Sequence, residues 1–111
     1  MKAVTIRVDK LNATDQEITT ALKELWFRQE IGGWWWYTGR NSYSGLWAFT
    51  YPHANAVTFE HRESVKKSMD FAIKLAKNFG GRLCNTQTRQ CTTIKLTKER
   101  KIKRIEKRLL E

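Results

Sequence analysis

One short stretch of this chain carries most of its aromatic side chains, and no other feature limits the fold as strongly. Eight of the 13 aromatic residues lie between Trp34 and Tyr51. Residues 34–38 and 46–51 have the composition of strands, in which successive side chains point to opposite faces. Residues 39–45 combine glycine with serine and asparagine, which predicts a loop between the two strands. Because aromatic rings dominate the cores of small domains, at least one face of this hairpin is expected to be core.

Strand and helix signals alternate along the rest of the chain. Thr14 and Glu17 form a capping box that begins a first helix, and Gly32 and Gly33 end it. A second helix with a regular apolar face is expected over residues 63–79. The remaining predicted elements are strands at residues 4–8, 56–60, 82–85 and 92–96, and a third helix at residues 98–110 that Thr97 would cap.

These elements follow one another in the order β-α-β-β-β-α-β-β-α. The first six or seven contain β-α-β-β-α-β, which is the ferredoxin-like split arrangement. We therefore expect an α+β fold, with an antiparallel sheet, helices packed on one face and a ferredoxin-like core. The 111 residues are enough for a single domain only, covering residues 1–111 and ending in a basic helix at about 98–110.

The net charge of +10 lies entirely in the second half of the chain. Residues 1–61 carry six basic and six acidic side chains, whereas residues 62–111 carry fifteen basic and five acidic ones. Clustered basic charge with a pI near 10 is typical of proteins that bind polyanions. The alternative interpretation is scattered surface charge that only keeps the protein in solution.

Two predicted helices hold most of this charge. On the second helix, four lysines share an arc of about 100° at 3.6 residues per turn; they are Lys66, Lys67, Lys74 and Lys77. On the third, six basic residues lie opposite a narrow apolar seam; they are Arg100, Lys101, Lys103, Arg104, Lys107 and Arg108. Like-charge pairs four residues apart destabilise this helix by about 0.2–0.5 kcal/mol each, so we expect a bound polyanion to order it. The seam lacks Trp and Phe, which disfavours a membrane surface.

The aromatic hairpin has three interpretations. Trp35 and Tyr37 share one face and Trp34 and Trp36 the other, so one set is expected to be core. The second set is an exposed platform for stacking bases, an anchor for a protein partner, or further core under an added element. The residues expected to stack or to anchor a partner are Trp35, Tyr37 and Tyr43, with Arg40 in the loop. Arg40 is within reach of a phosphate, although a solvated loop charge is the simpler interpretation.

The sequence shows no catalytic motif, no metal-ligand spacing and no cofactor-binding loop. His53 and His61 are eight residues apart across a predicted turn, and their convergence would permit general acid–base chemistry. Cys84 and Cys91 face each other if the last hairpin turns at Gln87 and Thr88. No signal peptide or membrane span is visible, so we expect a soluble cytoplasmic protein with both thiols reduced.

These patterns predict a non-enzymatic protein that binds RNA or DNA with weak sequence preference and without a cofactor. Phosphate contacts would come from the basic helices, with base stacking on the hairpin. One alternative is a small inhibitor or accessory protein, for example of a mobile element, that docks on an acidic partner through the same surface. A second alternative is a small metal-independent ribonuclease.

Overall fold

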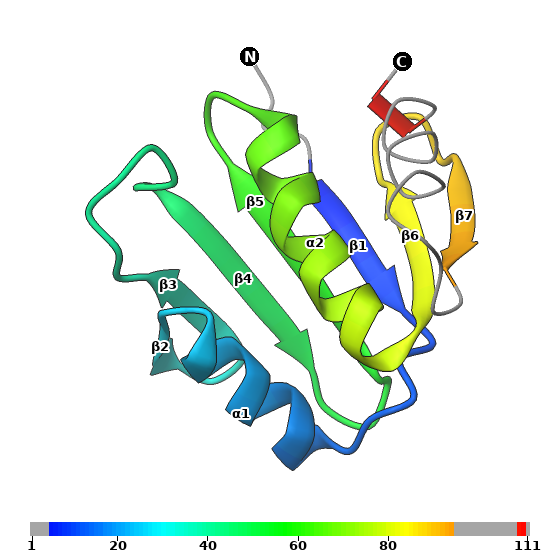
Figure 1. Cartoon of the computed structure of the whole chain (residues 1–111), viewed down its shortest axis with the longest axis horizontal. Coiled ribbons are helices and arrows are strands. Elements are labelled where there is room, and N and C mark those ends of the chain that lie inside the picture. Colours follow the sequence, from blue (N-terminus) through cyan, green and yellow to red (C-terminus); the bar gives the residue numbers. More distant parts are fainter. Residues whose placement is uncertain (1–4, 95–108, 111) are drawn as a thin grey trace.

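Seven strands form one antiparallel sheet, and two helices lie against the same face of it (Figure 1). The structure is a computed structural model that describes residues 5–94 and 109–110. Its elements are β1 (Thr5–Asp9), α1 (Asp15–Glu24), β2 (Phe27–Ile31), β3 (Trp34–Tyr37), β4 (Leu46–Tyr51), β5 (Ala56–His61), α2 (Val65–Phe79), β6 (Gly81–Asn85) and β7 (Cys91–Ile94). The strands lie in the order β2-β3-β4-β5-β1-β6-β7. This arrangement confirms the predicted α+β class with an antiparallel sheet and helices on one face.

The first helix ends much earlier than the sequence predicts. The capping box of Thr14 and Glu17 begins α1 as expected, with hydrogen bonds of 3.1 and 3.0 Å in the two directions. Beyond the helix, the backbone of Trp26 turns with a φ of 71° and the chain enters β2. Gly32 and Gly33 therefore form the tight turn of the β2–β3 hairpin and do not end a helix.

Packing of Phe27 explains why this segment is a strand. The Phe27 ring is 3% exposed and lies edge-on against Phe71 of α2, with 5.4 Å between ring centroids. It also contacts Tyr37 of β3 at 5.7 Å. Tertiary burial of one large ring overrides the weak helical signal of the residues around it. The predicted order is corrected to β-α-β-β-β-β-α-β-β within the described residues.

The other predicted elements within the described residues are confirmed, with bounds shifted by one or two residues. The second helix begins at Val65, and Ser64 caps it by accepting a 3.4 Å hydrogen bond from the Lys67 N–H. Residues 95–108, which make up most of the predicted third helix, lie outside the described residues. The carbonyl of Leu109, a buried residue, accepts a 3.0 Å hydrogen bond from Asn85 Nδ2. No helix in the described part of the chain is long and apolar enough to cross a membrane.

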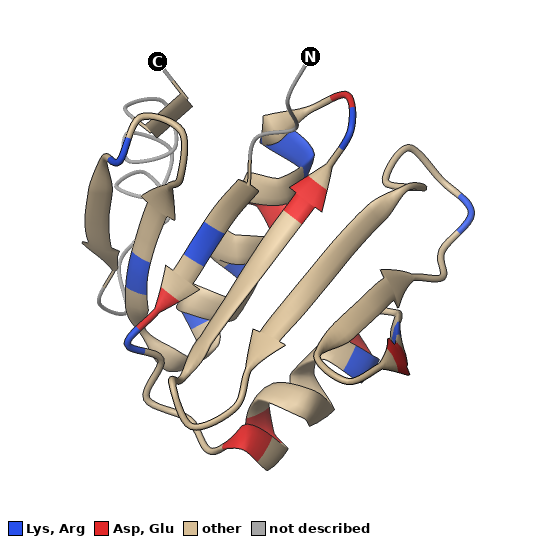
Figure 2. Cartoon of the chain, turned by 180° about the vertical axis from the view of Figure 1, so that it is seen from behind, with Lys and Arg blue, Asp and Glu red and all other residues tan. Residues whose placement is uncertain are grey.

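Alternation along the strands divides the sheet into two unlike faces. Side chains on the first face pack under α1 and α2 and form the core; they include Ile6, Val8, Trp35, Ala48, Val57, Phe59 and Leu83. Figure 2 shows the sheet from its other side, where no helix of the described residues lies in front of the strands. We call this second side the open face.

The hairpin of β2 and β3 forms one edge of the sheet. A β-bulge shifts the register between Gln29 and Ile31, and the rest of β2 after Phe27 is exposed. Gly33 holds the hairpin close to β4, because a Cβ at this position would lie 2.6 Å from the carbonyl oxygen of Thr50. The Thr50 N–H donates a hydrogen bond of 2.8 Å to the Gly33 carbonyl, which helps to fix the register of β3 against β4.

Candidate functional site

Five aromatic side chains gather on the open face, and we call them the aromatic ladder. They are Trp34 and Trp36 from β3, and Trp47, Phe49 and Tyr51 from β4. The register places Trp34 beside Phe49 and Trp36 beside Trp47. Trp34 and Trp36 are 44% and 37% exposed, and the other three are half-buried. A contiguous exposed aromatic surface is typical of a binding site, because elsewhere it favours aggregation.

The rings of the ladder contact one another along its whole length. The centroids of Trp36 and Trp47 are 3.3 Å apart, with an angle of 34° between the planes. Trp34 stands edge-on to Trp47 at 6.1 Å and to Phe49 at 4.8 Å, and Phe49 contacts Tyr51 at 4.9 Å. Such contacts restrict the rotamers of each ring. The ladder is therefore preorganised and would lose little side-chain entropy when a flat ligand binds.

Arginines flank the ladder on both sides. The guanidinium of Arg7 in β1 lies 5.3 Å from the centroid of the Tyr51 ring, which is a cation–π contact. Arg28 in β2 is the register partner of Trp36 and is exposed. Fixed positive charge therefore borders an apolar platform at both ends, an arrangement that suits a ligand with both flat rings and negative groups.

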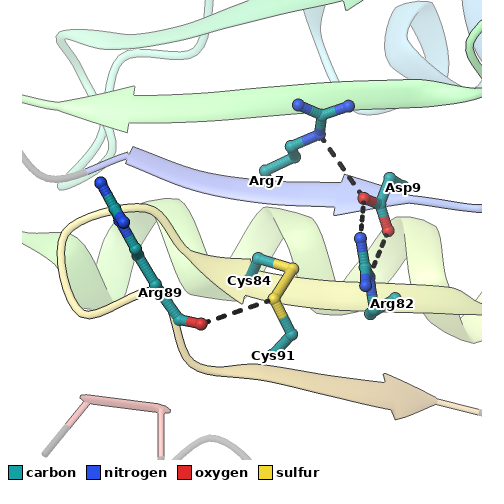
Figure 3. Close-up of polar contacts among 6 residues, drawn as sticks. All are labelled: Arg7, Asp9, Arg82, Cys84, Arg89 and Cys91. Carbon is teal, nitrogen blue, oxygen red and sulfur yellow. Dashed lines mark hydrogen bonds and ion pairs between the residues drawn. A yellow bond between two sulfur atoms is a disulfide. The ribbon is translucent and has the colours of Figure 1, made fainter.

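Arg7 belongs to a charged cluster that joins two neighbouring strands, β1 and β6 (Figure 3). Arg82 in β6 donates two hydrogen bonds to the Asp9 carboxylate, at 3.0 and 2.8 Å. These bonds hold the pKa of Asp9 below its ordinary value of 3.8, although desolvation acts in the opposite direction. Arg7 Nε lies 3.6 Å from the same carboxylate and has no hydrogen-bond partner among the described residues. Asp9 therefore holds Arg82 by two hydrogen bonds and Arg7 only by a longer ion pair, and the Arg7 side chain is 41% exposed.

Two hollows open beside the ladder. The larger has a volume of about 420 Å³, and Thr5, Arg7, Thr58 and Glu60 line it together with rings of the ladder. The smaller, of about 360 Å³, lies between Trp34, Trp47, Glu60 and Arg62. Both volumes fall in the range of small-ligand sites. Polar groups at the margin of an apolar surface give such sites their specificity.

The aromatic residues predicted to stack or to anchor a partner lie on the covered face, so this prediction is corrected. Trp35 is 1% exposed, and its Nε1–H donates to Thr50 Oγ1 at 3.3 Å. Tyr37 is half-buried against Phe27. Tyr43 donates a hydrogen bond of 2.8 Å to Asp70 in α2, and this bond raises the pKa of Tyr43. All three are used in packing, because α1, α2 and Phe27 cover the side of the hairpin on which they lie.

The lysines of α2 lie in the helix layer, behind the sheet as seen from the ladder (Figure 2). They are Lys66, Lys67, Lys74 and Lys77. Lys66 forms an ion pair with Asp70 at 3.6 Å, and the Lys74 ammonium lies 4.4 Å from the centroid of the Phe71 ring. The structure therefore does not bring these predicted phosphate-binding lysines together with the aromatic ladder.

Two further sets of predicted residues contribute no described contact to this site. Arg40 is exposed in the loop between β3 and β4, on neither of the strands that carry the ladder. Six basic residues of the predicted third helix lie outside the described residues; they are Arg100, Lys101, Lys103, Arg104, Lys107 and Arg108.

The two histidines do not form a pair. His53 is exposed in the turn before β5, whereas His61 is the last residue of β5. The length of β5, about 17 Å, therefore lies between the two residues. His61 is buried: its Nδ1 accepts from the Glu63 N–H at 3.1 Å, so its Nε2–H donates to the Ser44 carbonyl at 2.9 Å. Its role is to hold the loop before β4. Within residues 5–94 and 109–110, no group of three or more His, Cys, Asp or Glu side chains could hold a metal ion.

Cys84 and Cys91 form a disulfide that joins β6 to β7 (Figure 3). The expectation of two reduced thiols is therefore wrong. The two residues are register partners with Cα atoms 4.1 Å apart, which brings their sulfur atoms within bonding reach. The disulfide lies on the open face beside Arg7. Two strands, β5 and β1, separate it from the ladder.

Comparison with protein-family models, with curated proteins and with solved structures finds no match to this chain. Alternation alone separates Trp34 and Trp36 from Trp35, and the small side chain of Ala48 marks the side on which Trp35 needs room. The alternation is present in the sequence, whereas the burial of Trp35 in the core under the helices identifies the ladder as the outer set.

Proposed function

We propose that this protein binds single-stranded nucleic acid on the open face of its sheet. Bases stack on the aromatic ladder, and phosphates contact Arg7, Arg28 and Arg62 around it. The observation that carries the proposal is the ladder itself, since Trp34 and Trp36 keep 44% and 37% of their surface exposed. Base stacking on such rings contributes about 1–3 kcal/mol per base and tolerates any sequence. A duplex would gain less, because its bases are already stacked.

The order of the strands supports this proposal. We infer a ferredoxin-like core made of β4, β5, β1 and β6 with α1 and α2, to which the β2–β3 hairpin and β7 are additions. RNA-recognition domains stack bases on the uncovered face of a four-stranded sheet in the same manner. The hairpin added at β2 and β3 widens the uncovered face by two strands and supplies two of the five rings.

Charge outside the ladder has a different role in this proposal. The lysines of α2 and the basic residues near the C-terminus raise the positive potential of the whole molecule. That potential speeds the approach of a polyanion and adds affinity that salt weakens. Contacts of the six C-terminal basic residues with phosphate remain a prediction from the sequence. No catalytic step is part of the proposal.

A fluorescence titration tests this function with the tryptophans as reporters. Short single-stranded RNA, single-stranded DNA and duplex DNA are added at two salt concentrations. We expect the single strands to quench tryptophan emission and to bind more weakly at high salt. The double variant Trp34→Ala/Trp36→Ala is expected to lose about 10- to 100-fold in affinity.

Trp26→Ala is the matched control for that variant. Trp26 is 68% exposed, but it lies in the turn between α1 and β2 and outside the ladder. Its loss removes one exposed indole without touching the proposed site, so affinity is expected to stay at the wild-type level. Absence of binding by every oligonucleotide near physiological salt would contradict the proposal.

One observation favours a protein partner as a second candidate. Ile31 is 72% exposed, and the register places it beside Trp34, so the apolar surface continues past the ladder onto an aliphatic side chain. Trp, Tyr and Arg are also the residues enriched in protein–protein hot spots. A salt-resistant complex with an acidic protein, lost in Ile31→Ser but not in Trp26→Ala, would support an inhibitor or accessory protein over a nucleic-acid-binding one.

A further inference from the structure

Glu60 is the only acidic residue among the described residues that line the two hollows of the open face. It lies in β5, where its register partners are Trp47 of β4 and Thr5 of β1. Its side chain therefore stands between a ring of the ladder and a hydroxyl. A negative charge at this point weakens the attraction of the face for phosphate, so its presence calls for another explanation.

No hydrogen bond or ion pair joins the Glu60 carboxylate to another described residue. Arg7, which lines the larger hollow together with Glu60, lies against Asp9 and over the Tyr51 ring. A half-buried carboxylate beside aromatic rings has lost part of its hydration and gains most from a ligand that donates hydrogen bonds to it. Among the described residues, neither oxygen of Glu60 has a partner that would compete with such a ligand.

A base stacked on the ladder presents its edge to this carboxylate. Guanine carries two adjacent donors on its Watson–Crick edge, N1–H and the N2 amino group, at the spacing of two carboxylate oxygens. Adenine and cytosine offer one amino group beside an acceptor, and uracil offers one N–H between two acceptors. Acceptors facing a carboxylate are repelled, so the match of two donors to two oxygens discriminates among the bases.

We propose that Glu60 recognises guanine in a single strand bound on the open face, an inference that rests on the proposed function. The Glu60 carboxylate accepts from N1–H and N2–H of one base whose ring stacks against the ladder. The larger hollow, of about 420 Å³, has room beside this base, where Arg7 faces the phosphate and Thr5 and Thr58 supply hydroxyls. The protein then prefers strands that contain guanine, in place of the weak sequence preference expected from stacking alone.

The test uses the full chain and a set of oligouridine 8-mers that differ at one central position. That position holds G, A, C, U or inosine, which keeps the N1–H of guanine but lacks its 2-amino group. We expect the G-containing strand to bind about tenfold more tightly than the A, C and U strands, with inosine in between. Affinities come from the tryptophan titration at one salt concentration.

Glu60→Gln is the decisive variant, because it keeps the size of the side chain and replaces one of its two acceptors by a donor. We expect it to lose the preference for G and to bind the all-U strand as well as the wild type or better. Glu24→Gln, in α1 on the covered side of the sheet, removes the same charge and is expected to keep the preference for G. Thermal melts of both variants check that the fold is retained.

Two results would overturn the inference, and they differ from failure of the proposed function. Equal affinity of the wild type for all five strands, or a preference for G that survives in Glu60→Gln, removes Glu60 as the determinant while nucleic-acid binding stands. Failure of every strand to bind the wild type removes the proposed function and this inference with it.

Discussion

The two faces of the sheet are built from the same kinds of residue and differ in what covers them. On the covered face, Trp35 is 1% exposed and belongs to the same core cluster as Phe27, Phe59 and Phe71. On the open face, its neighbours Trp34 and Trp36 keep more than a third of their surface in solvent. Residue type alone therefore does not separate a structural tryptophan from one available to a ligand. The register of β3 and the position of the helices make that distinction.

The largest expected effect is on the free energy of unfolding, when neighbouring tryptophans of β3 that face opposite sides of the sheet are replaced. Trp35→Ala should lower the free energy of unfolding by about 3–5 kcal/mol, because it leaves a cavity under α1 and α2. Trp36→Ala, one residue away, should lower it by less than about 1 kcal/mol. Urea unfolding of both variants measures the difference. Similar losses at the two positions would mean that the open face is packed as tightly as the covered one.

The disulfide tests whether the outer part of the open face is stabilised independently of the ladder. Cys84→Ser/Cys91→Ser should lower stability by about 2 kcal/mol, since the bond closes a short loop between β6 and β7. Oligonucleotide affinity should not change, because the ladder is on β3 and β4. Wild-type protein in reductant provides the control and should unfold at the same urea concentration as the double variant; unaltered wild-type stability in reductant would contradict the prediction.

Asp9 tests whether charges of the open face contribute to the stability of the fold. Because Arg82 lowers the pKa of Asp9 in the folded state, this contribution is fully present above the ordinary pKa of 3.8 and is lost as pH falls through the lower, folded pKa. Asp9→Asn should cost about 1 kcal/mol at neutral pH and should remove this part of the acid destabilisation. Unfolding curves from pH 6 to pH 2 measure it, with Glu24→Gln as the control; parallel curves for wild type and Asp9→Asn would refute it.

The smallest expected effect is on the salt dependence of oligonucleotide affinity, and it distinguishes Arg7 on the open face from Lys77 in the helix layer. Arg7→Gln should reduce the slope of log affinity against log salt by about one, as expected for the loss of one phosphate contact. Lys77→Gln removes a charge from the helix layer and should leave the slope close to that of the wild type. The measurement is a salt series with one single-stranded oligonucleotide. A larger change in Lys77→Gln than in Arg7→Gln would move the phosphate contacts to α2.

Local signals in the sequence are enough to predict most elements and the class of the fold. The capping box at Thr14, the hairpin at 34–51 and the helix ending at Phe79 all depend on residues close in sequence. The β2 strand could not be predicted in this way, because Phe27 belongs to a strand only through contact with Phe71, 44 positions further along the chain. A pair of glycines is compatible with a helix end and with a hairpin turn, and only tertiary packing decides between them.

The sequence was enough to place the candidate site on the aromatic hairpin, but not to identify which of its aromatic residues are exposed. Alternation divides the tryptophans of β3 into two sets, yet it does not say which set the helices cover. Assignment of Trp35 to the accessible set reversed the two faces of the hairpin, because Trp35 is 1% exposed. The role proposed for Glu60 has no sequence signal at all, because its neighbours Thr5 and Trp47 are brought to it by strand pairing.

The bulge in β2 has a consequence for how this protein behaves at high concentration. A sheet with an exposed aromatic face and a straight free edge would extend from one molecule to the next by strand pairing, and the ladders would stack into a fibre. The register shift between Gln29 and Ile31 breaks the regular spacing of hydrogen-bonding groups at that edge, and Arg28 and Glu30 add charge along it. These features disfavour strand pairing between molecules through the β2 edge. The apolar surface that can contact other molecules is then the aromatic ladder on the open face.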